Sequence, residues 1–311
     1  MGGLWPGTIY SRTRIGLLMD SPTSSSLSPA TAVVTVSFGS GAVLPAFLDS
    51  VTGASSDSVL TVVADNKPEQ DEAVRSQSDE RGAVYLPLGS NRGYGGAINA
   101  AVATLPDSVR WVLVSNPDVV LAPGAIDVLV AAGESDQHVG SVGPRILTAS
   151  GEVYPSARAV PSLRTGVGHA LFVNLWAGNP WTRAYRRDAE SEAAVRDAGW
   201  LSGACVLVRR SVFDELGGFD DGFFMYFEDV DLGYRLGKAG YRNVYEPAAT
   251  ATHTGAHSTN SDSTQMVRVH HDSAKRFLGK KYRGALLWPI RVSLRLGLAI
   301  RSALVTRNLR H

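Results

Sequence analysis

The sequence predicts an α/β protein with a doubly wound, mostly parallel sheet. Between Ala32 and Ser115, short apolar runs alternate with segments of helical periodicity. A strand–helix order repeated over short connections is typical of a parallel sheet with helices on both faces. Polar residues stand at the end of each apolar run, and such sheets bind ligands beyond the carboxyl ends of their strands. Together these observations indicate a ligand-binding α/β domain.

The elements follow in order along the first half of the chain. Four runs are apolar throughout, as expected of strands buried on both faces, and helical patterns lie between them. The predicted strands are Ala32–Phe38, Ser58–Ala64, Ala83–Leu88 and Trp111–Ser115, and the predicted helices are Val43–Val51, Glu69–Gln77 and Gly95–Thr104.

The second half is less regular, because prolines and glycines interrupt the apolar pattern after Asp118. We interpret this half as an elaboration on the acceptor side. It contains a predicted strand at Trp200–Val208 and a predicted helix at Glu228–Ala239, which ends at Gly240.

Composition limits the class of protein. Hydrophobic residues make up 44% and charged residues 19% of the 311 residues, ordinary values for a globular enzyme. Cys205 is the single cysteine, which excludes an internal disulfide and favours a reducing, cytoplasmic location. Residues 1–30 contain no apolar stretch long enough for a signal peptide, and we expect a disordered leader there.

Charge is distributed unevenly along the chain. The net charge is +1, yet residues 275–311 hold ten Lys/Arg and no Asp/Glu, which leaves 20 basic and 29 acidic residues in positions 1–274. A basic tail on an acidic body indicates an anionic surface as partner.

The same tail shows a helical pattern. Within Ile290–Val305 one face is apolar, formed by Val292, Leu296, Ala299, Ile300 and Ala303. This stretch is too short to span a bilayer, so we expect an amphipathic helix that lies on the membrane surface. The alternative is a helix packed on the catalytic domain or in a dimer.

Two positions are suited to a divalent cation. Asn116-Pro117-Asp118 ends a predicted strand, where a carboxylate can hold Mg²⁺ or Mn²⁺ against a diphosphate. The alternative there is a simple turn before a helix. His253 follows a short apolar strand and is a second candidate ligand, although a single histidine is more often structural.

A glycine-rich segment, Asn91–Ala97, precedes a predicted helix. Small residues there let main-chain N–H groups approach an anion, and Arg92 adds positive charge. The segment lacks the Gly-Lys-Ser/Thr of a P-loop. A purely structural turn is the alternative.

Three acids, Glu228, Asp229 and Asp231, fall in the first turn of a predicted helix, where the helix dipole favours negative charge. The apolar run Phe223–Phe227 precedes them, and desolvation raises the pKa of a carboxylate and improves it as a general base. The alternative is an ordinary acidic first turn in which Asp231 pairs with Arg235.

Together these residues resemble the family 2 glycosyltransferases over Thr31–Thr254. The matching motifs are Asp65-Asn66, Asn91-x-Gly93-Tyr94-Gly95 with Asn99, Asn116-Pro117-Asp118, Gly217-Gly218-Phe219-Asp220, and Glu228-Asp229-Val230-Asp231-Leu232 with Arg235. The resemblance implies a GT-A-like fold, a nucleotide-sugar donor and inversion at the anomeric carbon. One departure is Asn116, which replaces the first acid of the usual metal motif.

The resemblance also implies residue roles. Asp229 corresponds to the catalytic base, and Asp118 and His253 correspond to ligands of Mg²⁺ or Mn²⁺. The implied substrate-binding residues are Ser37, Asp65, Asn66, Asn91, Arg92, Gly93, Tyr94, Asn116, Arg158, Trp200, Ser202, Gly203 and Glu228.

A closer resemblance is to the mycobacterial-type rhamnosyltransferases that build the linker between peptidoglycan and arabinogalactan. It is carried by Val153–Arg158, Asn179–Thr182 with Tyr185-Arg186, Gly199–Gly203 and Phe224–Gly233. It implies dTDP-L-rhamnose as donor, decaprenyl-diphosphate-linked N-acetylglucosamine as acceptor, and a peripheral site on the inner face of the cell membrane. We expect no nucleic-acid partner, and the oligomeric state stays open, a homo-oligomer included.

The expected organisation is a catalytic domain at residues 31–260, with a nucleotide-binding half at 31–120 and an acceptor half at 121–260, followed by a basic amphipathic helical tail at 261–311. Other classes remain as alternatives: another family 2 enzyme such as a galactofuranosyltransferase, a sugar-phosphate nucleotidyltransferase, and an inactive sugar-binding module. A nucleotidyltransferase would carry a basic glycine-rich loop after the first strand, and Ser37–Gly41 contains no basic residue.

Overall fold

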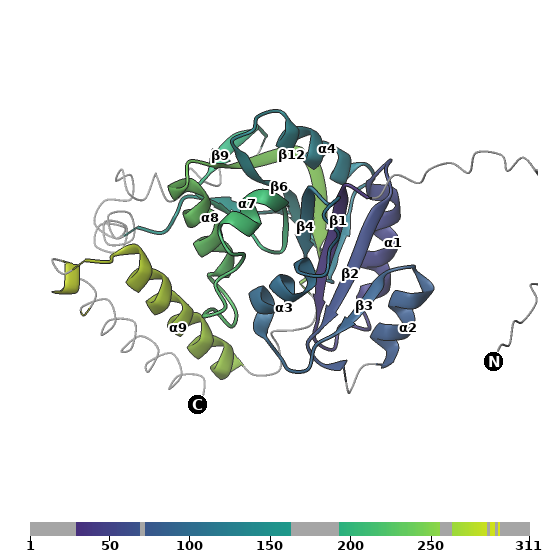
Figure 1. Ribbon diagram of the computed structural model, residues 1–311, viewed down its shortest axis with the longest axis horizontal. Coiled ribbons are helices and arrows are strands. Elements are labelled where there is room, and N and C mark those ends of the chain that lie inside the picture. Colours follow the sequence, from purple (N-terminus) through teal and green to yellow (C-terminus); the bar gives the residue numbers. More distant parts are fainter. Residues whose placement is uncertain are drawn as a thin grey trace, which may run out of the picture.

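The computed structural model describes residues 29–68, 72–162, 193–255, 263–284, 287–289 and 292. Nearly all of the predicted leader, the motif at 179–186 and most of the predicted amphipathic stretch at 290–305 lie outside the described residues. Within the described part, a large mixed sheet lies between two layers of helices (Figure 1).

The first half of the chain forms the parallel part of this sheet. Its strands are β1 (Thr31–Ser37), β2 (Val59–Asp65), β3 (Val84–Pro87) and β4 (Trp111–Ser115), in the order β3-β2-β1-β4. The register places Ser37 beside Asp65 and Thr35 beside Ser115, so the polar strand ends share one edge. The predicted strands are confirmed, with small differences at their ends.

The second half extends the sheet through β11 (Cys205–Arg209), β6 (Val139–Thr148), β12 (Arg242–His253) and β5 (Val119–Leu121). β11 is antiparallel to both β4 and β6, whereas β6 and β12 are parallel. The short strands β7 (Val153–Tyr154) and β9 (Arg196–Ala198) pair with β6 and β12. The sheet is therefore mostly parallel, and β4, β6 and β12 all point their carboxyl ends to one edge.

The predicted strand Trp200–Val208 is wrong as a single element. The chain forms β10 (Trp200–Leu201), which pairs with β8 (Ala157–Arg158), then a turn at residues 202–204, then β11. The turn forms because the Ser202 N–H donates to Ser156 O and the Cys205 N–H donates to Ser202 O. An unbroken apolar pattern hid this interruption.

Sequence patterns also gave no indication of β6, because Gly140, Gly143 and Pro144 interrupt its apolar run. The glycines are required by packing. A Cβ at Gly140 would lie 2.6 Å from the Leu236 side chain, and one at Gly143 would lie 2.9 Å from the Leu201 side chain.

The core divides into one cluster on each face of the sheet. One face is covered by α1 (Leu44–Ala54), α2 (Glu72–Glu80) and α4 (Ala125–Glu134). The other is covered by α3 (Gly93–Val102), α7 (Arg210–Glu215) and α8 (Glu228–Lys238), as Figure 1 shows. The predicted α8 is confirmed to within one residue, and Gly240 follows it in the left-handed region with φ of 91°.

Helix α9 (Ser263–Lys281) packs beside α8 (Figure 1). Phe277 is fully buried and joins Phe223 and Val230 in a third apolar cluster. Lys280 pairs with Asp220 and Asp231, each at 2.5 Å, and Arg276 pairs with Asp220 at 2.7 Å. The first part of the predicted tail is therefore a helix docked on the catalytic domain. Within the described ranges, no helix has the length and apolar character of a membrane span.

Candidate active site

Polar residues meet where β1, β2 and β4 end. Ser37, Asp65 and Ser115 are fully buried at this edge. Asp65 accepts hydrogen bonds from the Tyr85 hydroxyl at 2.8 Å and from the Lys67 N–H at 2.9 Å. These bonds fix the carboxylate at the carboxyl edge, where ligands of such sheets bind.

Asn66 holds the glycine-rich segment in place. Its Oδ1 accepts from the Arg92 N–H at 3.0 Å and its Nδ2 donates to Gly93 O at 3.0 Å. Gly93 has a φ of 71°, and a Cβ there would lie 2.0 Å from Phe224 O. No residue with a side chain fits this position, so the segment is set against residues 223–224.

The hydrogen bonds of this segment correct one prediction. The N–H groups of Arg92, Gly93 and Tyr94 donate to Asn66 Oδ1, Asn91 Oδ1 and Phe224 O. These three donors are therefore not free to bind an anion. The exposed side chains of Asn91 and Arg92 are what the segment offers to a ligand.

Tyr94 connects this segment to the turn at residues 202–204. Its hydroxyl donates to Gly203 O at 2.6 Å. Burial and the negative charges of Glu228, Asp229 and Asp118 raise the pKa of Tyr94 well above its usual value. The hydroxyl therefore stays protonated and keeps donating.

The two predicted metal ligands lie together. His253 Nε2 lies 3.1 Å from Asp118 Oδ1 and 3.3 Å from Asn116 Nδ2. The antiparallel pairing of β12 with β5 causes this, because it sets His253 beside Val119. The side chains of Asp118 and His253 are 14% and 23% exposed, so both reach solvent.

These two side chains suit a cation whose remaining ligands are substrate oxygens. Among the residues that the structure describes, no group of three or more His, Cys, Asp or Glu side chains is arranged to hold a metal. Mg²⁺ commonly binds through one or two protein ligands plus substrate phosphates. Asp118 and His253 match that pattern better than a site built from protein ligands alone.

Asp229 is held at the start of α8 by two main-chain donors. Its Oδ2 accepts from the Gly203 N–H at 3.0 Å and its Oδ1 accepts from the Val230 N–H at 2.7 Å. The side chain is only partly buried, so a substrate hydroxyl can approach it.

A strained turn aims α8 at the site. Tyr226 and Phe227 have φ of 66° and 68°, a left-handed conformation that costs residues with side chains about 1–3 kcal/mol each. Helix α9 supports them: the Phe227 ring lies 5.8 Å from the Phe277 ring and 5.3 Å from the His270 ring, and the Ser273 hydroxyl donates to Met225 O. α9 therefore stabilises the conformation that presents Asp229.

Glu228 and Asp229 are adjacent acids whose charges affect each other. Burial, followed by the charge of Asp229, raises the pKa of Glu228 to about 8. Glu228 Oε2 is buried and has no hydrogen-bond partner within the described part of the chain. Burial also raises the pKa of Asp229, but the two N–H donors and the charge of Arg158 oppose this rise. At neutral pH we therefore assign the proton to Glu228 and the negative charge to Asp229.

Asp231, the third acid, has a structural role, as in the alternative in which it pairs with Arg235. It is fully buried and pairs with Arg235 Nε at 2.7 Å as well as with Lys280. It is thus neutralised from two sides and anchors α9.

The remaining predicted substrate-binding residues have different surroundings. Ser202 is buried in the turn and its Oγ accepts from the Ala204 N–H. Arg158 donates from Nε to Pro155 O and lies near Asp229. Trp200 instead packs with Phe223 and Phe277 and donates from Nε1 to Ala159 O, so it supports α8 from the outside.

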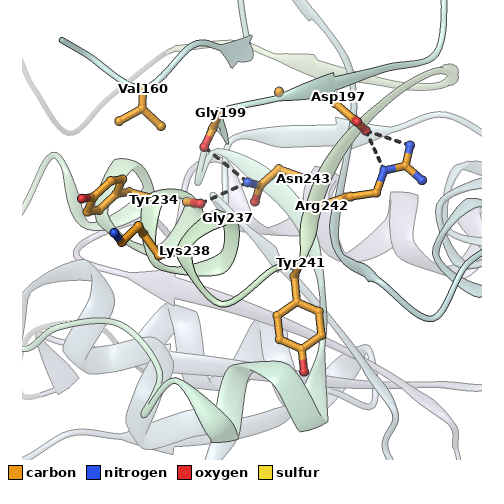
Figure 2. A pocket seen from close by; sticks show the side chains of 11 residues that line it. Val160, Asp197, Gly199, Tyr234, Gly237, Lys238, Tyr241, Arg242 and Asn243 are labelled. Atoms are coloured by element: carbon orange, nitrogen blue, oxygen red, sulfur yellow. Dashed lines mark hydrogen bonds and ion pairs between the residues drawn. The ribbon is translucent and has the colours of Figure 1, made fainter.

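A separate cavity of about 370 Å³ lies on the far side of α8 (Figure 2). Gly233, Tyr234 and Lys238 of α8 line it together with Gly199 and Asn243. Asn243 Nδ2 donates to Gly199 O (Figure 2) and also to Gly233 O, which closes one wall. This cavity shares no lining residue with the groups around Asp118 and Asp229.

Sequence patterns missed Arg145, which lies in β6 and has a buried Nε without a hydrogen-bond partner in the described ranges. The available signal was a single cation within an otherwise uncharged run, Val139–Thr148. Lys280 was also missed as a partner of Asp231 in α8, and Arg276 as a partner of Asp220, because their charges suggested a solvent-facing tail.

Comparisons with known proteins agree with this geometry. Residues 29–271 match the family model described as "Glycosyltransferase like family 2". The chain is 42% identical over 285 residues to the N-acetylglucosaminyl-diphospho-decaprenol L-rhamnosyltransferase of Mycobacterium tuberculosis, covering 89% of this chain and 92% of that protein. It is 30% identical to the rhamnosyltransferase WbbL of Escherichia coli, covering 61% of this chain and 71% of that protein.

Solved structures show the same fold. The mannosyltransferase PcManGT of Pyrobaculum calidifontis, in complex with GDP-Man and Mn²⁺, matches with a TM-score of 0.55 and 16% identity over 89% of this chain and 74% of that chain. GalNAc-T7 with UDP, GalNAc and Mn²⁺ matches with a TM-score of 0.54 and 16% identity over 88% of this chain and 55% of that chain. The expected GT-A-like fold is confirmed at this level.

The buried Glu228 predicts a pH-dependent stability. Its pKa in the folded protein, about 8, exceeds the usual value of 4.5, so the folded state holds this proton more tightly than the unfolded state. The stabilisation is complete below pH 4.5 and is lost as pH rises through 8. In Glu228→Gln, urea unfolding should show a stability that falls less between these limits than in the wild type.

The matched control is Glu152→Gln, which changes an exposed glutamate and should keep the wild-type pH profile. Wild-type and Glu228→Gln curves that run parallel from pH 4.5 to 8.5 would contradict the assignment of the proton to Glu228.

Proposed function

The chain belongs to the family 2 glycosyltransferases, and we propose that it transfers L-rhamnose from dTDP-L-rhamnose to N-acetylglucosaminyl-diphospho-decaprenol. The observation that carries this proposal is the 42% identity to the mycobacterial rhamnosyltransferase over most of both chains. The grouping of Asp118, His253, Glu228 and Asp229 supports it, because transfer needs a base and a means to stabilise a leaving diphosphate.

The proposed reaction is a single displacement at the anomeric carbon. The acceptor hydroxyl oxygen forms a bond to this carbon, its proton passes to Asp229, and the bond from the carbon to the nucleoside diphosphate breaks. Asp229 suits the role because it is partly exposed, is oriented by the Gly203 and Val230 N–H groups, and is the member of the acid pair to which we assign the negative charge. One base acting in one displacement inverts the configuration.

Asp118 and His253 are proposed to hold Mg²⁺ or Mn²⁺. The bound cation would neutralise charge on the leaving diphosphate. Asn116 Nδ2 lies 3.3 Å from His253 Nε2, so this side chain borders the proposed cation site.

The acceptor places the enzyme at a membrane. A polyprenyl chain stays in the bilayer, so we propose peripheral binding at the inner face of the cell membrane. Because α9 is docked through Lys280 and Phe277, the membrane-binding part is assigned to the residues after Gly284. Trp288 and Val292 are 59% and 43% exposed there, and five arginines follow Gly284. Each basic residue near anionic lipid adds roughly 1 kcal/mol.

A donor panel tests the proposed function. With a soluble N-acetylglucosaminyl-diphospholipid analogue, release of nucleoside diphosphate should require dTDP-L-rhamnose and should be low with UDP-galactofuranose or UDP-glucose. Asp229→Asn should bind dTDP as the wild type does while turnover falls by about 10²-fold, the usual effect of losing a general base. Faster turnover of another donor would overturn the choice of sugar, and unchanged turnover in Asp229→Asn would overturn the choice of base.

Chelation tests the cation. EDTA should abolish transfer and added Mg²⁺ or Mn²⁺ should restore it, because Asp118 and His253 offer metal-binding oxygen and nitrogen atoms. His253→Ala should raise the Mg²⁺ or Mn²⁺ concentration needed for half-maximal activity by about tenfold, whereas His138→Ala, which removes an exposed histidine, should not change it. Full activity in EDTA would contradict a role for a cation.

Truncation after Gly284 tests the membrane proposal. A cut after Gly279 would remove Lys280 and undock α9, so the later cut isolates the outer tail. The shortened enzyme should keep its melting temperature and its turnover of a short soluble acceptor, but lose salt-sensitive binding to phosphatidylglycerol vesicles. Equal loss of activity on soluble and long-chain acceptors, with a lower melting temperature, would show that the outer tail supports the fold instead.

A further inference from the structure

Arg145 lies on the face of the sheet that carries the active site. It follows Gly143 and Pro144 in β6, and the next residue, Ile146, is fully buried in the cluster with α1 and α4. Successive side chains of a strand point to opposite faces. Arg145 therefore projects toward the face covered by α8 and β10, as does Gly143, whose Cβ would contact Leu201.

The neighbouring strands place Arg145 between the metal ligands and the base. On one side it is in register with Thr250 of β12, three residues before His253. On the other side, Leu207 of β11 pairs with Val142, and this antiparallel register brings Ala204 to the level of Arg145. Ala204 O accepts from the Asn116 N–H, and the adjacent Gly203 N–H donates to Asp229.

The guanidinium of Arg145 lacks the partners that other partly buried arginines have. Its Nε is buried and unbonded, and it forms no ion pair with a carboxylate in the described ranges. By contrast, Arg209 donates from Nε to Val139 O and from Nη2 to Gly133 O, and Arg235 pairs with Asp231. A buried N–H donor without an acceptor is destabilising, so the unbonded Nε points to a ligand that supplies an acceptor atom here.

We propose that Arg145 binds a diphosphate group of the substrates. This rests on the proposed function, in which both donor and acceptor carry a diphosphate. Asp118 and Asp229 keep negative charge at the site, and an anion of two or three charges needs a compensating cation beyond the metal. A guanidinium suits this ligand because its planar donors match two phosphate oxygens at once.

The test compares binding in Arg145→Met, Arg145→Lys and the wild type by calorimetry with Mg²⁺ present. The probes are inorganic diphosphate and dTDP, and the KM for the soluble diphospholipid acceptor is measured at saturating donor. Inorganic diphosphate is independent of the sugar and base that the enzyme uses, so it separates this proposal from the choice of donor. The control is Arg210→Met. In the wild type, Arg210 also has a buried nitrogen without a hydrogen-bond partner, but it pairs with Asp214 at the opposite edge of the sheet.

Arg145→Met should weaken inorganic diphosphate binding at least tenfold, and Arg145→Lys should recover part of the loss. Weaker binding of dTDP with an unchanged acceptor KM assigns Arg145 to the donor diphosphate. Unchanged binding of dTDP with a raised acceptor KM assigns it to the acceptor diphosphate. The melting temperature of Arg145→Met should stay equal or rise, because a buried N–H donor without an acceptor has been removed. The proposal would be overturned if Arg145→Met had the same diphosphate binding and acceptor KM as Arg210→Met. A lowered melting temperature with binding intact would also overturn it.

Discussion

The turn at residues 202–204 is the constraint on which the rest of the site depends. Three hydrogen bonds meet on two adjacent residues: the Gly203 N–H donates to Asp229, Gly203 O accepts from the Tyr94 hydroxyl, and Ala204 O accepts from the Asn116 N–H. The base, the glycine-rich segment and the metal-binding strand end come from distant parts of the chain. Because one short turn binds all three, their positions are fixed relative to one another. A small displacement of this turn would misplace the reacting groups together, which matters because catalysis requires near-ideal orientation.

Helix α9 stabilises strained and charged parts of the site. The site holds a buried Glu228 without a partner for Oε2, two left-handed residues before α8, and a fully buried Asp231. Each of these features destabilises the fold on its own. Lys280 neutralises Asp231, and Phe277 and His270 pack against the strained turn. The helix is therefore part of the catalytic domain in physical terms, although its sequence reads as the start of a basic tail.

Sequence patterns predicted the first half of the fold well because its strands are uninterrupted apolar runs. Burial on both faces is confirmed for β1 and β4, whereas β3 lies at the edge of the sheet and is partly exposed. Asp118 and His253 were predicted to act together because the family resemblance supplied this pairing. Local sequence patterns do not contain it. They failed where tertiary packing required small or rigid residues: Gly140, Gly143 and Pro144 break the apolar pattern of β6 although the strand is continuous. At Trp200–Val208 the error was the opposite one. The apolar run predicted a single strand and concealed the turn that orients the base. The N–H groups of Arg92, Gly93 and Tyr94 looked available for an anion because the sequence does not reveal that Asn66, Asn91 and Phe224 accept from them.

Charge balance connects these observations. A diphosphate substrate is repelled by the carboxylates that the chemistry needs, so the protein must keep the number of negative charges low and place cations among them. It lowers the number by burying Glu228, whose raised pKa keeps it protonated at neutral pH, and by pairing Asp231 with Arg235 and Lys280. Asp229 and Asp118 then remain as the charged acids at the site. Arg158 lies near the first and His253 contacts the second, and Arg145 stands between them without a carboxylate partner in the described part of the chain. The proposed role of Arg145 fits this charge balance: β6 carries one arginine in an otherwise uncharged run, and a diphosphate would supply the counter-charge that the described residues do not.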